Sequence, residues 1–195
     1  MKLHPVRVAL ATLLVLTAGL LFVGRAGALS TGSGGWQWQN PLPDGAAYNG
    51  MYFTTAQRGW LLTNTCILKT TDGGATVTVQ SNHNVQFKDI TFFGSKRGWA
   101  VGWPLDPGKD RVVIYRTTNG GASWAQVPLN VKGWLNAVCF VNKNVGWAVG
   151  GKGSMGAGEA GLVLKTVNGG VTWTQQSASG GSELNDVSMI SATRG

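Results

Sequence analysis

The stretch Ile114-Tyr-Arg-Thr-Thr-Asn-Gly-Gly-Ala-Ser-Trp124 decides the fold, because this chain contains it three times. The earlier copy runs from Ile67 to Val77 and the later copy from Val163 to Trp173. Each copy alternates apolar and polar residues before an Asx-Gly-Gly turn, which predicts a strand, a tight turn and a second strand. The Asx side chain can bond nearby backbone N–H groups, and glycines adopt positive φ without steric cost. The turn residues are Asp72, Gly73, Gly74, Asn119, Gly120, Gly121, Asn168, Gly169 and Gly170.

The spacing of the three turns predicts a repeat protein. Asp72, Asn119 and Asn168 lie 47 and 49 residues apart, and each repeat also carries an apolar strand and a strand of small residues such as Trp99-Ala-Val-Gly102. Four antiparallel strands in about 48 residues is the size of a β-propeller blade. Trp supplies apolar area between blades, Ala and Gly allow close approach, and the glycine before Trp is expected to hold a bulge with positive φ. The predicted fold class is therefore all-β, a propeller of four-stranded antiparallel blades.

The predicted blades occupy residues 47–80, 86–129 and 134–177, and 183–195 would begin a further blade, with a first strand at Asn185–Ile190. Residues 29–35 read as a Ser/Gly linker. The segment 36–42 is similar to the last strand of each repeat, so we expect it to close the ring as the outermost strand of a final blade. The chain stops within a repeat motif, at Ser191–Gly195, which indicates a truncated propeller.

Residues 1–28 predict a secretory signal peptide. Lys2 and Arg7 precede an apolar run at 8–23, and Ala26-Gly-Ala28 fits a cleavage site. The alternative is an uncleaved anchor, although a membrane span needs roughly 20 residues and this run is shorter. Both alternatives export the rest of the chain.

The charge of the exported part limits its partners. Removing residues 1–28 lowers the net charge from +8 to +5, since that segment holds three cations and no acid. A moderately basic surface permits an acidic protein partner or an anionic membrane surface. There is no nucleic-acid motif. Cys66 and Cys139 fall in non-adjacent repeats, so we expect no disulfide.

Catalysis is not expected. Glycosidases generally need two carboxylates at a set separation, and the two glutamates, Glu159 and Glu183, lie in Gly/Ser-rich loops. Tyr52 lies on a strand that we expect to line the central channel of the propeller. No glutamate is expected at the same height in that channel to act as its partner. The remaining candidates for chemistry have structural interpretations; they are Asp72 in a turn, and Asp89 and Asp186 at equivalent repeat positions.

Metal and cofactor sites are not expected either. His83 reads as a solvated loop residue. Asp106 and Asp110 flank a Pro-Gly-Lys turn, which favours a polar loop over a calcium site. Gly150-Gly-Lys-Gly-Ser154 lacks the spacing of a phosphate-binding loop.

Two levels of resemblance follow from these motifs. Thr/Ser-x-Asp-x-Gly-x-Thr/Ser-Trp is the Asp-box, or bacterial neuraminidase repeat. It matches here at Thr70–Val77, where Val77 replaces Trp, and at Thr117–Trp124 and Thr166–Trp173, where Asn119 and Asn168 replace Asp. The longer pattern, from Arg97-Gly-Trp-Ala-Val-Gly102 to the Asx-Gly-Gly turn, resembles the photosystem II stability/assembly factor family. That resemblance implies a seven-bladed, non-enzymatic propeller of the thylakoid lumen or periplasm that binds an early reaction-centre subunit, with a membrane-associated partner.

The resemblance also implies a basic partner-binding patch. The candidates are Lys96, Arg97, Arg111, Arg116 and Lys69. Arg58 and Arg97 occupy the same repeat position, so a structural turn role is the alternative for them. Two other functions remain open: an extracellular or surface propeller that binds a glycan or protein in a non-photosynthetic bacterium, and a fragment of a sialidase-like glycosidase.

Overall fold

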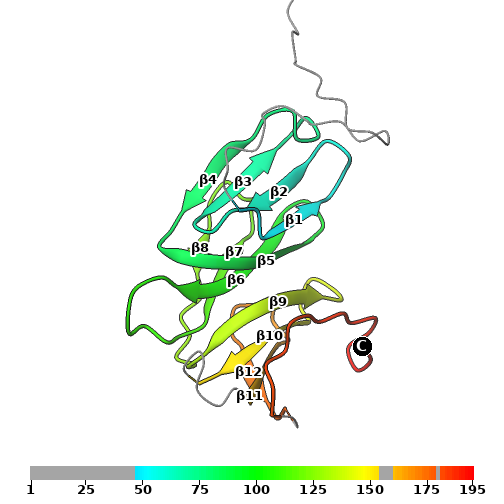
Figure 1. Ribbon diagram of the computed structural model, residues 1–195. Helices are drawn as coiled ribbons and strands as arrows, with labels where there is room; N and C mark the ends of the chain where they lie inside the picture. Colours follow the sequence, from blue (N-terminus) through cyan, green and yellow to red (C-terminus); the bar gives the residue numbers. More distant parts are fainter. Residues whose placement is uncertain (1–46, 154–159, 179–180) are drawn as a thin grey trace, which may run out of the picture. The chain divides into compact units, whose positions relative to one another are not determined.

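The computed structural model describes residues 47–153, 160–178 and 181–195, all within the compact unit 41–195. In this part of the chain, twelve strands form three four-stranded antiparallel sheets (Figure 1). Blade 1 holds β1 (Gly50–Phe53), β2 (Gly59–Leu62), β3 (Cys66–Thr70) and β4 (Thr78–Asn82). Blade 2 holds β5 (Val85–Phe93), β6 (Arg97–Pro104), β7 (Val113–Thr117) and β8 (Ala125–Gln126). Blade 3 holds β9 (Trp134–Phe140), β10 (Gly146–Lys152), β11 (Ala160–Thr166) and β12 (Thr174–Gln176).

The blades follow one another as in a propeller. Within each blade the strands pair in sequence order, and the first strands β1, β5 and β9 lie side by side, with β5 between the other two. The predicted all-β fold of four-stranded blades is confirmed.

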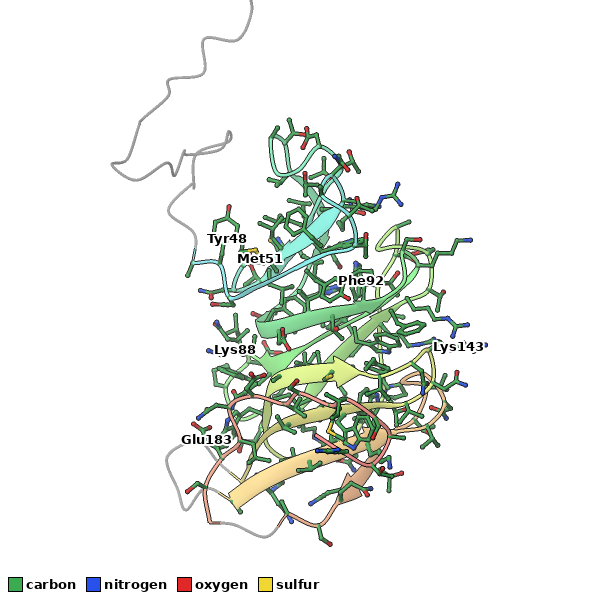
Figure 2. All side chains as sticks on the ribbon, turned by 90° about the vertical axis from the view of Figure 1, so that its right-hand side faces the viewer. Tyr48, Met51, Lys88, Phe92, Lys143 and Glu183 are labelled. Carbon is green, nitrogen blue, oxygen red and sulfur yellow. The ribbon has the colours of Figure 1, made fainter. Side chains whose placement is uncertain are left out.

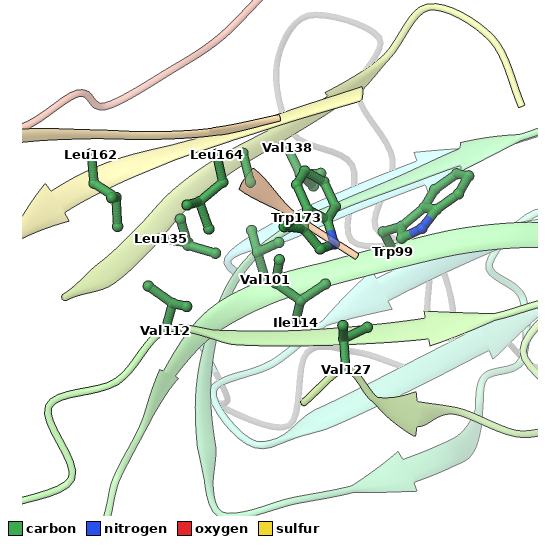
Figure 3. Packing of buried hydrophobic residues seen from close by; sticks show 11 residues of the cluster. Trp99, Val101, Val112, Ile114, Val127, Leu135, Val138, Leu162, Leu164 and Trp173 are labelled. Carbon is green, nitrogen blue, oxygen red and sulfur yellow. The ribbon is translucent and has the colours of Figure 1, made fainter. Parts of the chain in front are cut away.

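The core lies between the blades rather than inside any one sheet. Residues of β6 alternate in direction, so Val101 packs toward blade 3 while Ala100 packs toward blade 1. Figure 3 shows Trp99, Val101 and Ile114 of blade 2 facing Leu135 and Leu164 of blade 3. Burying each such aliphatic side chain stabilises the fold by about 1.5–3 kcal/mol. Both faces of β6 are covered, which is why its sequence is continuously apolar or small rather than alternating.

A stacked aromatic pair joins each blade to the next. Trp60 of blade 1 stacks on Phe92 of blade 2 with ring centroids 3.8 Å apart, and Trp99 of blade 2 stacks on Phe140 of blade 3 at 3.5 Å. Both indoles are fully buried. The repeated tryptophan is therefore a contact between blades, as its large apolar area predicts.

The glycine before each tryptophan has a different role from the predicted one. Gly98 is not among the glycines with positive φ, so the prediction of a bulge with positive φ was wrong. Gly98 pairs with Phe92 across β5 and β6, and an added Cβ would lie 2.5 Å from the Phe92 ring. Gly59 and Gly146 meet Phe53 and Phe140 in the same way. The glycine leaves room for the phenylalanine ring that stacks on the neighbouring blade.

The strand predicted at 185–190 is not formed. First strands in the other blades pair with a second strand, and no strand of the described residues pairs with this segment. Leu184, the residue just before it, bonds blade 3: its N–H donates to the Gly150 carbonyl at 3.0 Å, and Asn136 Nδ2 donates to its carbonyl at 3.0 Å.

Several predictions fall outside the described residues. They are the signal peptide at 1–28, the linker at 29–35, the closing strand at 36–42 and the loop that holds Glu159. In the part of the chain that the structure describes, no helix is long and apolar enough to cross a membrane. Cys66 and Cys139 are free thiols, as expected.

Candidate functional site

The site begins with the Asx-Gly-Gly turn, which is built by hydrogen bonds from two side chains. In blade 2, the Thr117 hydroxyl donates to Asn119 Oδ1 at 2.9 Å and accepts the N–H of Gly121 at 3.0 Å. Asn119 Oδ1 also accepts the Ser123 N–H at 3.0 Å. The threonine is buried, so these bonds satisfy a polar group that would otherwise be costly. The predicted bonds from the Asx side chain to nearby backbone N–H groups are confirmed.

The exchange of Asp and Asn between the turns has a direct explanation. Asp72 Oδ2 accepts the Thr76 hydroxyl proton at 2.7 Å, whereas Asn119 Nδ2 donates to the Ser123 hydroxyl oxygen at 2.8 Å. A hydroxyl group can donate or accept, so either residue completes the same turn. The turn therefore has a structural role and carries no acid catalyst.

Asp72 makes the stability of the first turn depend on pH. Hydrogen bonds from the Thr76 hydroxyl and N–H, and from Thr70, lower the pKa of Asp72 from its ordinary value of 3.8 to about 2. A depressed carboxyl pKa contributes stability that is present above the unfolded-state value and is lost as the pH falls through the folded-state value. Asp72→Asn should therefore fold normally at neutral pH and lose the part of the acid sensitivity that appears between pH 3.8 and about 2.

Urea unfolding of wild type and D72N across that range measures the effect. The wild type should lose stability relative to D72N as the pH falls. Parallel curves would contradict the assignment. Asn119 and Asn168 show that the fold accepts the substitution, since they already occupy this position in the other two blades.

Basic side chains of one blade reach the turn of the next. Lys69 Nζ donates to the Gly120 carbonyl at 3.0 Å, and Arg116 Nε donates to the Gly169 carbonyl at 2.7 Å. Trp99 Nε1 donates to the same Gly169 carbonyl at 3.1 Å. Two of the five predicted partner-binding cations, Lys69 and Arg116, thus hold blades together. Neither is fully free to meet a partner.

The topology places six turns at one end of the blades. First and third connections of an antiparallel blade emerge at the same end, and backbone bonds join them, for example from the Gly120 N–H to the Lys96 carbonyl. We call this end the turn face; it comprises the turns and the strand residues next to them, 54–58, 71–77, 93–97, 116–124, 141–145 and 167–173. The opposite end, which includes the connections 105–112 and 127–133, is the loop end. Figure 2 shows Lys143 at the turn face, and Lys88 and Glu183 at the other end of the blades.

The structure divides the predicted basic patch. Lys96, Arg97 and Arg116 lie at the turn face, where Arg97 Nη1 approaches the Lys143 carbonyl at 3.4 Å. Burial, and then the neighbouring Arg97, lower the pKa of Arg116. Arg111 lies just before β7, at the loop end. There its side chain donates to Asn130 and its backbone pairs with that of Lys132. Arg111 therefore does not join the other cations.

Lys143 is a turn-face cation that the sequence-based prediction missed. It lies in the β9–β10 turn, at the position that Ser95 holds in the β5–β6 turn. Alignment of the turns would have placed it at the turn face. Asp72 is the one carboxylate within the turn-face ranges, so this end of the described blades is strongly basic.

Comparison with known proteins identifies the family. Residues 30–136, more than half of the 195-residue chain, match the family described as Photosynthesis system II assembly factor YCF48. The chain belongs to this family. No curated protein matches it in sequence.

Two solved YCF48 structures are similar to the chain. The structure titled "YCF48 bound to D1 peptide" is 25% identical with a TM-score of 0.54, and the match covers 70% of this chain and 43% of that one. YCF48 from Cyanidioschyzon merolae is 27% identical with a TM-score of 0.52, and the match covers 70% and 39%. The GH74 xyloglucanase from Xanthomonas campestris matches at 14% identity, a TM-score of 0.50 and 66% and 21% coverage, which shows the fold alone. The chain spans less than half the length of each of these proteins.

The acidic residues of this YCF48-family chain have structural partners. Asp89 Oδ2 accepts the N–H of Val138 in the next blade at 2.8 Å, and burial raises the pKa of Asp89. Asp106 pairs with Lys109 at 2.6 Å. The carboxylate of Glu183 accepts the Trp134 indole N–H at 2.8 Å.

The loop end of this YCF48-family chain also departs from one prediction. His83 lies in a loop as expected but is only partly exposed, because its ring stacks on Tyr115 at 4.0 Å, and burial lowers its pKa. A hollow of about 260 Å³ lies between Trp103, Trp134 and the 104–110 connection. Within residues 47–153, 160–178 and 181–195, no group of three or more His, Cys, Asp or Glu side chains could hold a metal ion.

Proposed function

We propose that this chain is a non-catalytic, exported propeller that binds a photosystem II reaction-centre subunit during assembly. The observation that carries the proposal is its membership of the YCF48 family, one solved member of which is titled as bound to a D1 peptide. The apolar run and small-residue cleavage motif of residues 1–28 support export, to the thylakoid lumen or the periplasm.

The turn face is the proposed contact. Its cations are Arg58, Lys96, Arg97, Arg116 and Lys143, and Asp72 is its one carboxylate among the described residues, so an acidic segment of the partner would meet little repulsion there. Lys96 and Lys143 are exposed, and their side chains form no hydrogen bond with the described residues. The structural partners of Asp89, Asp106 and Glu183 support a non-catalytic role.

The variant Lys96→Glu/Arg97→Glu tests the contact. We expect its affinity for a fluorescent synthetic D1 peptide to fall at least about tenfold at low ionic strength, and the difference to shrink as salt screens the charges. Fluorescence anisotropy measures the binding, and thermal unfolding verifies that the variant is folded.

Lys132→Glu/Lys152→Glu is the matched control, since both lysines are exposed, lie at the loop end and give the same change in charge. It should bind the peptide within about twofold of wild type. Equal losses in the two variants would remove the turn face as the contact, and a wild type that does not bind the peptide would contradict the proposed function.

A further inference from the structure

The turn face carries exposed apolar side chains among its cations. Phe93 ends the first strand of blade 2 and is 41% exposed. Val167 and Val171 lie on the Asx-Gly-Gly turn of blade 3 and are 67% and 53% exposed. These three side chains belong to blades 2 and 3 and are interleaved with lysines and arginines.

The two valines are not required by the turn. The bonds of the third turn use Thr166, Asn168, Gly170 and Thr172. The positions of Val167 and Val171 are occupied by Thr118 and Ala122 in blade 2, and by Thr71 and Ala75 in blade 1. The same hydrogen bonds form in those turns without an exposed aliphatic side chain. A role outside the fold therefore accounts better for the valine pair.

The cations around the valines are not neutralised. Lys143, Arg97 and Arg116 converge on the Gly169 turn, through the contacts of Arg97 with Lys143 and of Arg116 with Gly169. The ion pair found in the described residues, Lys109–Asp106, lies at the loop end. A surface that opposes the turn face must therefore supply negative charge and also accept apolar side chains.

We propose that the turn face docks on an anionic lipid surface. Lysine and arginine side chains would meet the negatively charged headgroups, while the two valines and Phe93 enter the boundary between headgroups and acyl chains. Apolar side chains spread over two blades among cations suit a planar, mixed interface better than a single apolar groove of a protein. The inference extends the proposed function, because a face resting on the membrane would meet a reaction-centre subunit there.

Vesicle co-sedimentation of the full chain without signal peptide, in the absence of any peptide, tests the inference. The chain should bind vesicles of equal parts phosphatidylglycerol and phosphatidylcholine, bind phosphatidylcholine vesicles much more weakly, and dissociate as salt increases. Lack of binding to the anionic vesicles, or equal binding to both, would overturn the proposal.

Two variants separate the electrostatic and apolar parts. Lys96→Glu/Lys143→Glu should weaken binding to the anionic vesicles at least about tenfold, whereas Lys132→Glu/Lys152→Glu at the loop end should change it little. Val167→Thr/Val171→Ala restores the blade 2 residues and should weaken binding several-fold while the salt dependence remains. Losses of equal size in the loop-end control, or no loss in the valine variant, would contradict docking through this face.

The peptide experiment and the vesicle experiment fail independently. If the chain binds the D1 peptide in solution but no anionic vesicle, the proposed function stands and lipid docking is excluded. If it binds anionic vesicles through the turn face but not the peptide, lipid docking stands and the proposed partner is wrong.

Discussion

Gly170→Ala is expected to destabilise the protein by about 3–4 kcal/mol, far more than an alanine substitution usually does. Gly170 has a φ of +77°, so alanine must adopt a backbone conformation that side chains disfavour. The added Cβ would also lie 2.3 Å from Trp99 Nε1. The indole would have to move, and its bond to the Gly169 carbonyl and its stacking on Phe140 would both weaken.

Gly74→Ala is the matched control for that variant. Gly74 occupies the same position in the turn of blade 1 with a φ of +93°, but nothing lies within 4 Å of its added Cβ. It should therefore show the backbone cost alone, about 1–2 kcal/mol. Urea denaturation of both variants gives the comparison. Equal losses would mean that the contact with Trp99 contributes nothing to the effect.

Trp99→Ala is expected to reduce stability by about 3–5 kcal/mol. The side chain is fully buried, stacks on Phe140, and lies in the cluster between blades 2 and 3. Its removal would leave a large cavity between two sheets and weaken the junction of the blades. Thermal unfolding should show a lower Tm, and a loss under about 1 kcal/mol would contradict this role.

Phenylalanine substitutions separate stacking from hydrogen bonding. Trp99→Phe keeps an aromatic ring but loses the bond from Nε1 to Gly169. Trp60→Phe loses no such bond, because Trp60 Nε1 is buried without a hydrogen-bond partner in the described part of the chain. Trp99→Phe should therefore be the more destabilising of the two, by about 1 kcal/mol. The reverse order would show that the indole N–H is unimportant at this junction.

Much of the fold was predictable from local signals. The Asx-Gly-Gly turns, their positive φ values and the four-strand repeat follow from alternation and turn chemistry within a few residues. The role of Gly98 was not predictable in this way. A glycine required for positive φ and one required for the approach of the Phe92 ring look identical in sequence.

The candidate site was predictable only in part. Residue type identified Lys96, Arg97, Arg111, Arg116 and Lys69 as cations, but their grouping depends on which end of a strand each one occupies. Arg111 and Arg116 are five residues apart in sequence, yet Arg111 precedes β7 and Arg116 lies near the far end of that strand, which places them at opposite ends of the blade. Lys143 escaped notice because its nearest cations come from another blade.

By itself, the sequence determined the repeat, the turn chemistry and the excess of cations, because each of these depends on residues close together in the chain. Only the tertiary structure decided that Lys69 and Arg116 bond the carbonyls of Gly120 and Gly169 in the next blade. These contacts join residues 51 and 53 positions apart, a separation that no local pattern encodes. The stacking of blades creates the turn face, since it brings turns distant in sequence to one end of the sheets.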